Sequence, residues 1–162
     1  MGVTSVTKDL DGLSMTVVSE YDVTVARAWL LWADPRELER WWGPPTYPAT
    51  GEEHDLVPGG RITYYMTGPE GERFPGYWHV LEVDGPTLLA VEDGFADDEG
   101  APNPDMPTTR MRVELAPRSG GGVVMTMTST FPSVEAFEQL IDMGMEQGLL
   151  AAMGQIDEVL AG

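Results

Sequence analysis

Residues 132–162 read PSVEAFEQLIDMGMEQGLLAAMGQIDEVLAG, and this C-terminal stretch decides the fold. Ser133 suits a helix N-cap, and Glu135 in the first turn suits the positive end of the helix dipole. We therefore expect one helix of about 28 residues, roughly 40 Å long. Its apolar residues recur every three or four positions, which lines up one helix face: Val134, Phe137, Ile141, Met145, Leu149, Met153, Ile156 and Leu160.

Three glycines, Gly144, Gly148 and Gly154, interrupt this predicted helix. Each costs about 1 kcal/mol relative to alanine in a helix interior. Gly144 and Gly148 are four residues apart and therefore share one side. One interpretation is close backbone packing or a kink; the other is that the pair leaves room for a molecule bound between helix and sheet.

Composition limits the classes of function. The chain has 162 residues, no cysteine, and 9 basic against 27 acidic residues, for a net charge of −18. The absence of cysteine excludes disulfides and thiolate chemistry, and the negative charge argues against nucleic acid or an anionic membrane as partner. Because no basic-then-apolar leader and no long apolar run is present, we expect a cytoplasmic protein.

The chain before the C-terminal stretch alternates mostly as strands do. Residues 1–12 are predicted to be a loose N-terminus, and residues 13–23 a half-buried strand. Residues 25–42 have helical spacing that Asp34-Pro35 interrupts, which predicts two short helices with Asp34 capping the second. Six further strands are predicted, and residues 94–107, rich in Gly, Pro and Asp, are predicted to form a mobile loop. These strands lie at residues 47–57, 61–67, 74–83, 88–92, 108–117 and 123–131.

The short connections between these strands allow only a mostly antiparallel sheet, because parallel crossovers need longer links. One face of that sheet is apolar, and the C-terminal helix is the element that can cover it. We therefore predict an α+β fold in which a curved antiparallel sheet wraps around a long C-terminal helix, with two short helices after the first strand. Residues 13–162 are expected to form a single domain.

Several short motifs occur together in one order. Residues 25–44 read VARAWLLWADPRELERWWGP, and they are followed by DLVPGGR at 55–61, LEVDGP at 81–86 and GMEQG at 144–148. This series resembles the START-like (SRPBCC) superfamily, in the branch named after the activator of heat-shock protein 90 ATPase homologue (C-terminal-domain type). Two positions depart from the branch's pattern: Gly85 stands where a proline is usual, and Met145 where a tryptophan is usual.

The resemblance covers about residues 13–160 and implies a helix-grip fold that encloses a cavity. The superfamily includes carriers of hydrophobic ligands, polyketide cyclases and aromatases, and chaperone activators, so fold alone does not choose among them. The branch often forms homodimers, and no stretch of this sequence specifies an interface.

Ten methionines suggest a soft apolar space between sheet and helix, since methionine adapts to irregular shapes and is common at binding surfaces. The same pattern fits a filled, methionine-rich core. Of the tryptophans at positions 41 and 42, one is expected to plug the core and the other to flank a cavity mouth. The candidate cavity residues are Trp42, Tyr64, Met66, Trp78, Met111, Met127, Phe131, Met145, Gly148 and Leu149.

Signals for catalysis or metal binding are weak. His54 lies among acidic residues, but a strand turns neighbouring side chains to opposite faces, so no metal site is predicted and no cofactor is expected. His79 is a candidate general acid or base by side-chain type alone. Arg61, Arg110 and Arg112 are candidate anchoring charges. Strand parity points them away from the apolar face, however, so we expect them to form surface ion pairs with the many acidic residues.

The sequence thus favours a protein that binds a small hydrophobic or aromatic molecule between sheet and C-terminal helix, with no catalytic residue assigned. The first alternative is a cyclase- or aromatase-type enzyme, in which His79 or Tyr64 moves protons. The second is a chaperone-associated interaction protein of the stress response, which needs an exposed apolar surface and no cavity.

Overall fold

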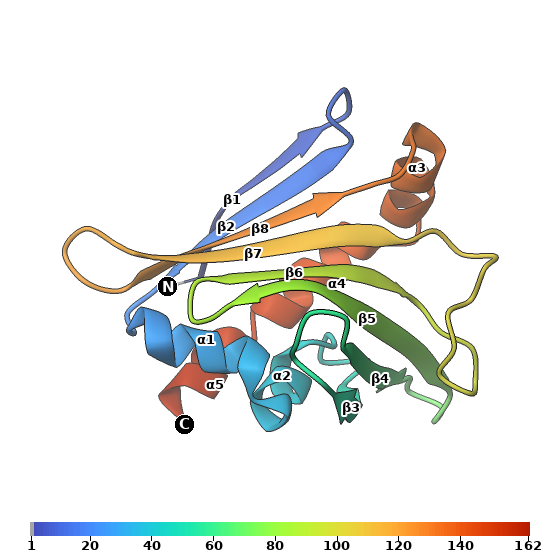
Figure 1. Cartoon of the computed structure of the whole chain (residues 1–162), viewed down its shortest axis with the longest axis horizontal. Coiled ribbons are helices and arrows are strands. Elements are labelled where there is room, and N and C mark those ends of the chain that lie inside the picture. The colour runs from blue at the N-terminus through green and yellow to red at the C-terminus, as the bar shows by residue number, and fades with distance from the viewer. Residues whose placement is uncertain (1) are drawn as a thin grey trace.

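The central feature of the computed structural model, which describes residues 2–162, is one curved sheet (Figure 1). Eight strands pair antiparallel throughout, in the order β1-β2-β8-β7-β6-β5-β4-β3. The strands are β1 (Gly2–Asp9), β2 (Ser14–Tyr21), β3 (Ala49–His54), β4 (Arg61–Thr67), β5 (Arg73–Asp84), β6 (Leu88–Phe95), β7 (Thr109–Pro117) and β8 (Val123–Thr130). The predicted α+β helix-grip architecture is confirmed.

The N-terminal residues correct the prediction of a loose start over residues 1–12. Gly2–Asp9 forms β1, which pairs with β2 at the edge of the sheet; Met1 lies outside the described residues. Most β1 side chains are exposed, with Val6 packed against the core. Backbone hydrogen bonds to β2 therefore keep β1 in the sheet. The sequence of β1 lacks the alternation of apolar and polar residues from which a strand is predicted.

Two short helices follow β2 as predicted, α1 (Val25–Ala33) and α2 (Pro35–Trp41). Thr24 caps α1, and the Asp34 side chain accepts a hydrogen bond of 2.9 Å from the Arg36 amide to cap α2. Arg27 joins the two helices through Glu37 at 2.7 Å. Together they close one end of the space that the sheet encloses.

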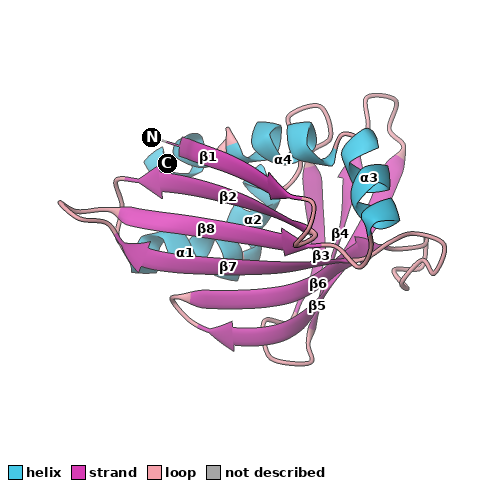
Figure 2. Cartoon of the chain, turned by 90° about the horizontal axis from the view of Figure 1, so that it is seen from above, coloured by secondary structure: helices cyan, strands magenta, loops and turns pink. Residues whose placement is uncertain are grey.

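The C-terminal stretch is not the single long helix that its periodicity predicts. It forms α3 (Val134–Asp142), α4 (Met145–Met153) and α5 (Ile156–Ala161) (Figure 1), and Figure 2 shows α3 and α4 from above. The first break is at Gly144, whose φ of 90° is left-handed and favours glycine. The second lies at Gly154-Gln155, where the Gln155 side-chain amide donates to the Gly43 carbonyl at 2.6 Å. The spacing of apolar residues continues through both breaks, so it does not reveal them.

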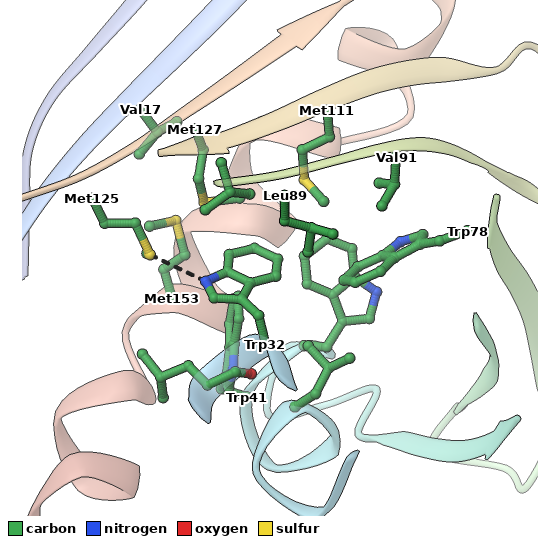
Figure 3. Close-up of a cluster of buried hydrophobic side chains, with 14 of the residues drawn as sticks. Val17, Trp32, Trp41, Trp78, Leu89, Val91, Met111, Met125, Met127 and Met153 are labelled. Atoms are coloured by element: carbon green, nitrogen blue, oxygen red, sulfur yellow. Dashed lines mark hydrogen bonds between the residues drawn. The ribbon is translucent and has the colours of Figure 1, made fainter. Parts of the chain in front are cut away.

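Much of the apolar core lies between the sheet and helices α1, α2 and α5. Figure 3 shows Trp32 pointing toward sheet side chains such as Met125 and Leu89, with Trp41 below it. The Trp32 indole N–H donates to the Met125 sulfur at 3.4 Å, and the Trp41 indole N–H donates to the Leu31 carbonyl at 3.0 Å. Trp41 is thus the predicted core plug.

Among the described residues, no helix combines the length and apolar character needed to cross a membrane.

A candidate ligand-binding cavity

A cavity of about 320 Å³ lies at the other end of the sheet, beneath α3 and α4. Its volume falls at the lower end of the range of about 300–1,000 Å³ typical of small-molecule sites. Strands β4 to β8 supply one wall, α3 and α4 the other. The lining residues are Trp42, Pro44, Tyr47, Tyr64, Met66, Phe74, Pro75, Gly76, Asp93, Gly94, Phe95, Pro107, Thr109, Met111, Ser129, Leu140, Met143, Gly144, Met145, Gly148 and Leu149.

The mouth of the cavity is rimmed by exposed apolar side chains. Tyr47, Phe74, Phe95 and Met143 all line the cavity and are all exposed, Phe74 by 51% and Met143 by 54%. The Tyr47 and Phe74 rings lie 5.8 Å apart in an edge-to-face arrangement. The apolar lining therefore continues to the protein surface at the entrance.

Seven of the ten residues predicted for the cavity line it: Trp42, Tyr64, Met66, Met111, Met145, Gly148 and Leu149. The other three, Trp78, Met127 and Phe131, are buried in the surrounding core. Trp78 stands behind Trp42, with ring centroids 4.8 Å apart, and the Phe131 ring packs on Phe137 at 4.4 Å. Strand parity places all three on the inner face correctly, but it does not tell which part of that face is filled.

Gly148 and Gly144 play different roles. A Cβ added at Gly148 would meet no atom within 4 Å, so this position borders open space rather than a tightly packed neighbour. Gly144 supplies the left-handed turn between α3 and α4. The interpretation that the pair leaves room between helix and sheet therefore applies to Gly148, and the interpretation of a kink applies to Gly144.

The main polar feature of the cavity is the pair Asp93 and Tyr64. Asp93 lies on β6 opposite Trp78 of β5, and it accepts a long hydrogen bond of 3.4 Å from the Tyr64 hydroxyl of β4. Burial raises the pKa of the Asp93 carboxyl from 3.8 to about 7, although the hydrogen bond from Tyr64 and the Trp78 indole act in the opposite direction. Burial also raises the pKa of Tyr64 well above 10, and the nearby Asp93 charge adds to that rise.

Further polar groups surround this pair. Thr109 of β7 pairs with Asp93 in the sheet ladder, and Ser129 of β8 lines the cavity beside Met111. The indole N–H groups of Trp42 and Trp78 are buried without a well-formed hydrogen bond. Of the described residues that line the cavity, none is a lysine, arginine or histidine.

Asp93 is the functional candidate that sequence reasoning missed. The predicted strand ended at Glu92, whereas β6 continues to Phe95. Because alternate residues of a strand share a face, Asp93 lies on the same face as Leu89, Val91 and Phe95. The alternation therefore continues to Asp93, but the Gly-, Pro- and Asp-rich composition of residues 94–107 favours a loop and hides the end of the strand.

The other polar candidates lie away from the cavity. His79 is exposed, and the His54 Nε2 atom lies 3.1 Å from the Ala33 carbonyl, with its pKa lowered by burial. Arg61 pairs with Glu53 at 3.0 Å, and Arg112 pairs with Glu82 and Glu114 at 3.7 and 3.5 Å. The prediction that these arginines form surface ion pairs is confirmed for Arg61 and Arg112.

Comparison with known proteins supports the architecture across the chain. The sequence profile of the family described as Activator of Hsp90 ATPase homolog 1-like protein matches residues 22–161. The crystal structure of protein Ms6760 from Mycobacterium smegmatis is 46% identical, with a TM-score of 0.89 over 98% of this chain and 96% of that one. A solution structure of a protein from Arthrobacter aurescens is also 46% identical, with a TM-score of 0.93 over 98% and 92%.

More distant structures share the fold alone. The AHSA1 protein from Silicibacter pomeroyi is 19% identical, with a TM-score of 0.72 over 91% of this chain and 97% of that one. No curated protein matches the chain.

Proposed function

The chain belongs to the Activator of Hsp90 ATPase homolog 1-like protein family, and we propose that it binds a small hydrophobic or aromatic molecule in the cavity between the sheet and helices α3 and α4. The observation that carries the proposal is a cavity of about 320 Å³ whose apolar lining reaches the surface at an exposed rim. Exposed apolar side chains gathered at one concave site favour a binding role over a purely structural one.

Gly148 supports the proposal from the helix side. A glycine inside a helix costs about 1 kcal/mol relative to alanine, and here no neighbouring atom requires its small size. The absent side chain instead enlarges the cavity. Filling this position is therefore the most direct way to remove the site while the fold is kept.

The test compares Gly148→Leu with a matched control, Ala151→Leu, which adds bulk at an exposed position of the same helix. Binding of 2-naphthylmethanol, a neutral two-ring probe, is measured by isothermal titration calorimetry. We expect saturable binding to the parent protein and to Ala151→Leu, and at least tenfold weaker binding to Gly148→Leu. Melting temperatures establish that all three proteins are folded.

Two results would oppose the proposal. If the parent protein does not bind the probe, the cavity is not a site for hydrophobes. If Gly148→Leu binds as well as the parent, the probe occupies another surface. Native mass spectrometry of gently purified protein then measures the mass of any natural ligand.

A second candidate function is an enzyme that removes a proton next to a carbonyl, as a cyclase does. Asp93 favours it, because a carboxyl with a pKa of about 7 suits a general base at neutral pH. Proton–deuterium exchange at the central CH₂ of benzoylacetone, followed by NMR, measures this activity. Faster exchange with the parent protein that is lost in Asp93→Asn supports the enzyme; equal rates with both proteins refute it.

A further inference from the structure

The charge that the cavity can carry is zero or negative. Asp93, Tyr64 and Tyr47 are the titratable groups among the lining residues described, and none of these can become positive. The whole chain also carries a net charge of −18. A ligand entering this site therefore meets no basic group that would attract an anion.

The walls of the cavity offer aromatic faces to a ligand. Trp42 and Tyr64 lie at the inner end, with ring centroids 6.2 Å apart, and Tyr47, Phe74 and Phe95 lie at the mouth. The faces of such rings attract cations as well as apolar groups. The aromatic rings that line the cavity therefore favour a ligand with an apolar body and a positively charged group.

The polar pair supplies a hydrogen-bond acceptor inside the cavity. The Tyr64 hydroxyl donates to Oδ1 of Asp93 over 3.4 Å, and this contact leaves Oδ2 unused. The surrounding apolar lining, with Met66 and Met111 among it, excludes water from the pair once a ligand fills the space. A charge-assisted hydrogen bond formed there is stronger than one at the surface.

We propose that the cavity binds a hydrophobic amine, whose apolar body fills the space beneath α4 and whose ammonium group donates to the Asp93 carboxylate. This inference rests on the proposed function and specifies its ligand class. A carboxylate ligand would place a second negative charge beside Asp93, and a neutral alcohol would gain a hydrogen bond without the charge attraction. The expected order of affinity is therefore amine, then alcohol, then carboxylate.

Three probes of nearly equal size test the order: 2-naphthylmethylamine, 2-naphthylmethanol and 2-naphthoate, titrated by calorimetry at pH 8. The proteins are the parent chain, Asp93→Asn, and Glu92→Gln as the matched control. Glu92 neighbours Asp93 on β6 but does not line the cavity. We expect the parent protein and Glu92→Gln to bind the amine at least about tenfold more tightly than the alcohol. In Asp93→Asn the affinities for the amine and the alcohol should become equal within about threefold.

The pH dependence of binding supplies a second readout. A carboxyl with a pKa of about 7 is mostly ionised at pH 8 and mostly protonated at pH 6, so amine affinity should fall about tenfold at pH 6 in the parent protein. The ammonium group stays protonated at both values. In Asp93→Asn the amine affinity should be the same at both pH values.

The outcomes separate this inference from the proposed function. Binding of the alcohol without a preference for the amine, or a preference that survives in Asp93→Asn, overturns the amine assignment and leaves a hydrophobe-binding cavity. Tightest binding of 2-naphthoate overturns it in the same way. Failure of all three probes to bind the parent protein overturns both.

Discussion

Replacing Asp93 by asparagine should make folding stability less dependent on pH. The folded protein holds the pKa of Asp93 at about 7, against an ordinary value of 3.8. Between these values the folded state binds a proton that the unfolded state has released. Stability therefore falls as pH rises from about 4 through about 7, and asparagine, which does not titrate, is free of this loss.

The size of the effect follows from the two pKa values. For pKa values of 3.8 and about 7, ionisation of Asp93 lowers the free energy of unfolding by roughly 2 kcal/mol at pH 5 and roughly 4 kcal/mol at pH 8. The free-energy difference between Asp93→Asn and the parent should therefore grow by about 2–3 kcal/mol from pH 5 to pH 8. Because Asp93 is only half-buried, solvent screening places the measured growth toward the lower value.

Urea denaturation of both proteins at pH 5 and pH 8 measures this difference. Other acidic groups titrate in both chains, so most of their effect cancels when the two are subtracted. Glu92→Gln is the control, because it removes a carboxyl from the same strand outside the cavity. Its difference from the parent should change by less than about 1 kcal/mol.

A difference between Asp93→Asn and the parent that stays constant within about 0.5 kcal/mol would refute the reasoning. It would mean that the Asp93 carboxyl is as well solvated in the folded protein as in the unfolded chain. A growing difference in Glu92→Gln as well would show that the effect belongs to the net charge and not to the cavity.

Three further predictions concern the fold. Gly144→Ala should destabilise the protein by roughly 1–2 kcal/mol, because the φ of Gly144 is 90°. Gly148→Ala should stabilise it by up to about 1 kcal/mol, because the added Cβ meets no atom within 4 Å. Changes in melting temperature of the same sign for both variants would contradict this prediction. Met127→Asp should lower the free energy of unfolding by more than about 3 kcal/mol, because it buries an unpaired charge. Thr128→Asp, on the other face of β8, should lower it by less than about 1 kcal/mol. Equal urea midpoints for the two variants would disprove the assignment of these residues to opposite faces. Gln155→Ala should cost about 1 kcal/mol by removing the hydrogen bond to the Gly43 carbonyl; an unchanged urea midpoint would show that this contact does not stabilise the break.

The sheet was predictable because each inner strand alternates between two environments. In β8, for example, Met125 and Met127 are buried while Thr126 and Thr128 are only partly so, and this period of two is written in the sequence. The edge strand β1 escapes prediction because nearly all its side chains are exposed. Its pairing depends on backbone groups that every residue carries.

The breaks in the C-terminal helix escape prediction for a different reason. Helical periodicity records which side chains face the core, and that pattern can continue while the backbone turns. Gly144 marks one break by its left-handed conformation, yet Gly148, with the same spacing from its apolar neighbours, lies inside α4. Sequence alone does not separate the two glycines, because the distinction lies in what each one faces.

Three features that lower stability meet at the cavity, and they come from separate parts of the chain. Asp93 places a carboxyl on a strand face otherwise occupied by Leu89 and Val91. Gly148 interrupts a helix without any neighbour requiring it, and Phe74 remains exposed at the rim. Each could be replaced by a residue that suits the fold better, and local rules are commonly broken where a protein acts. Because all three border one space, a common role in ligand binding explains them more directly than three independent imperfections of packing.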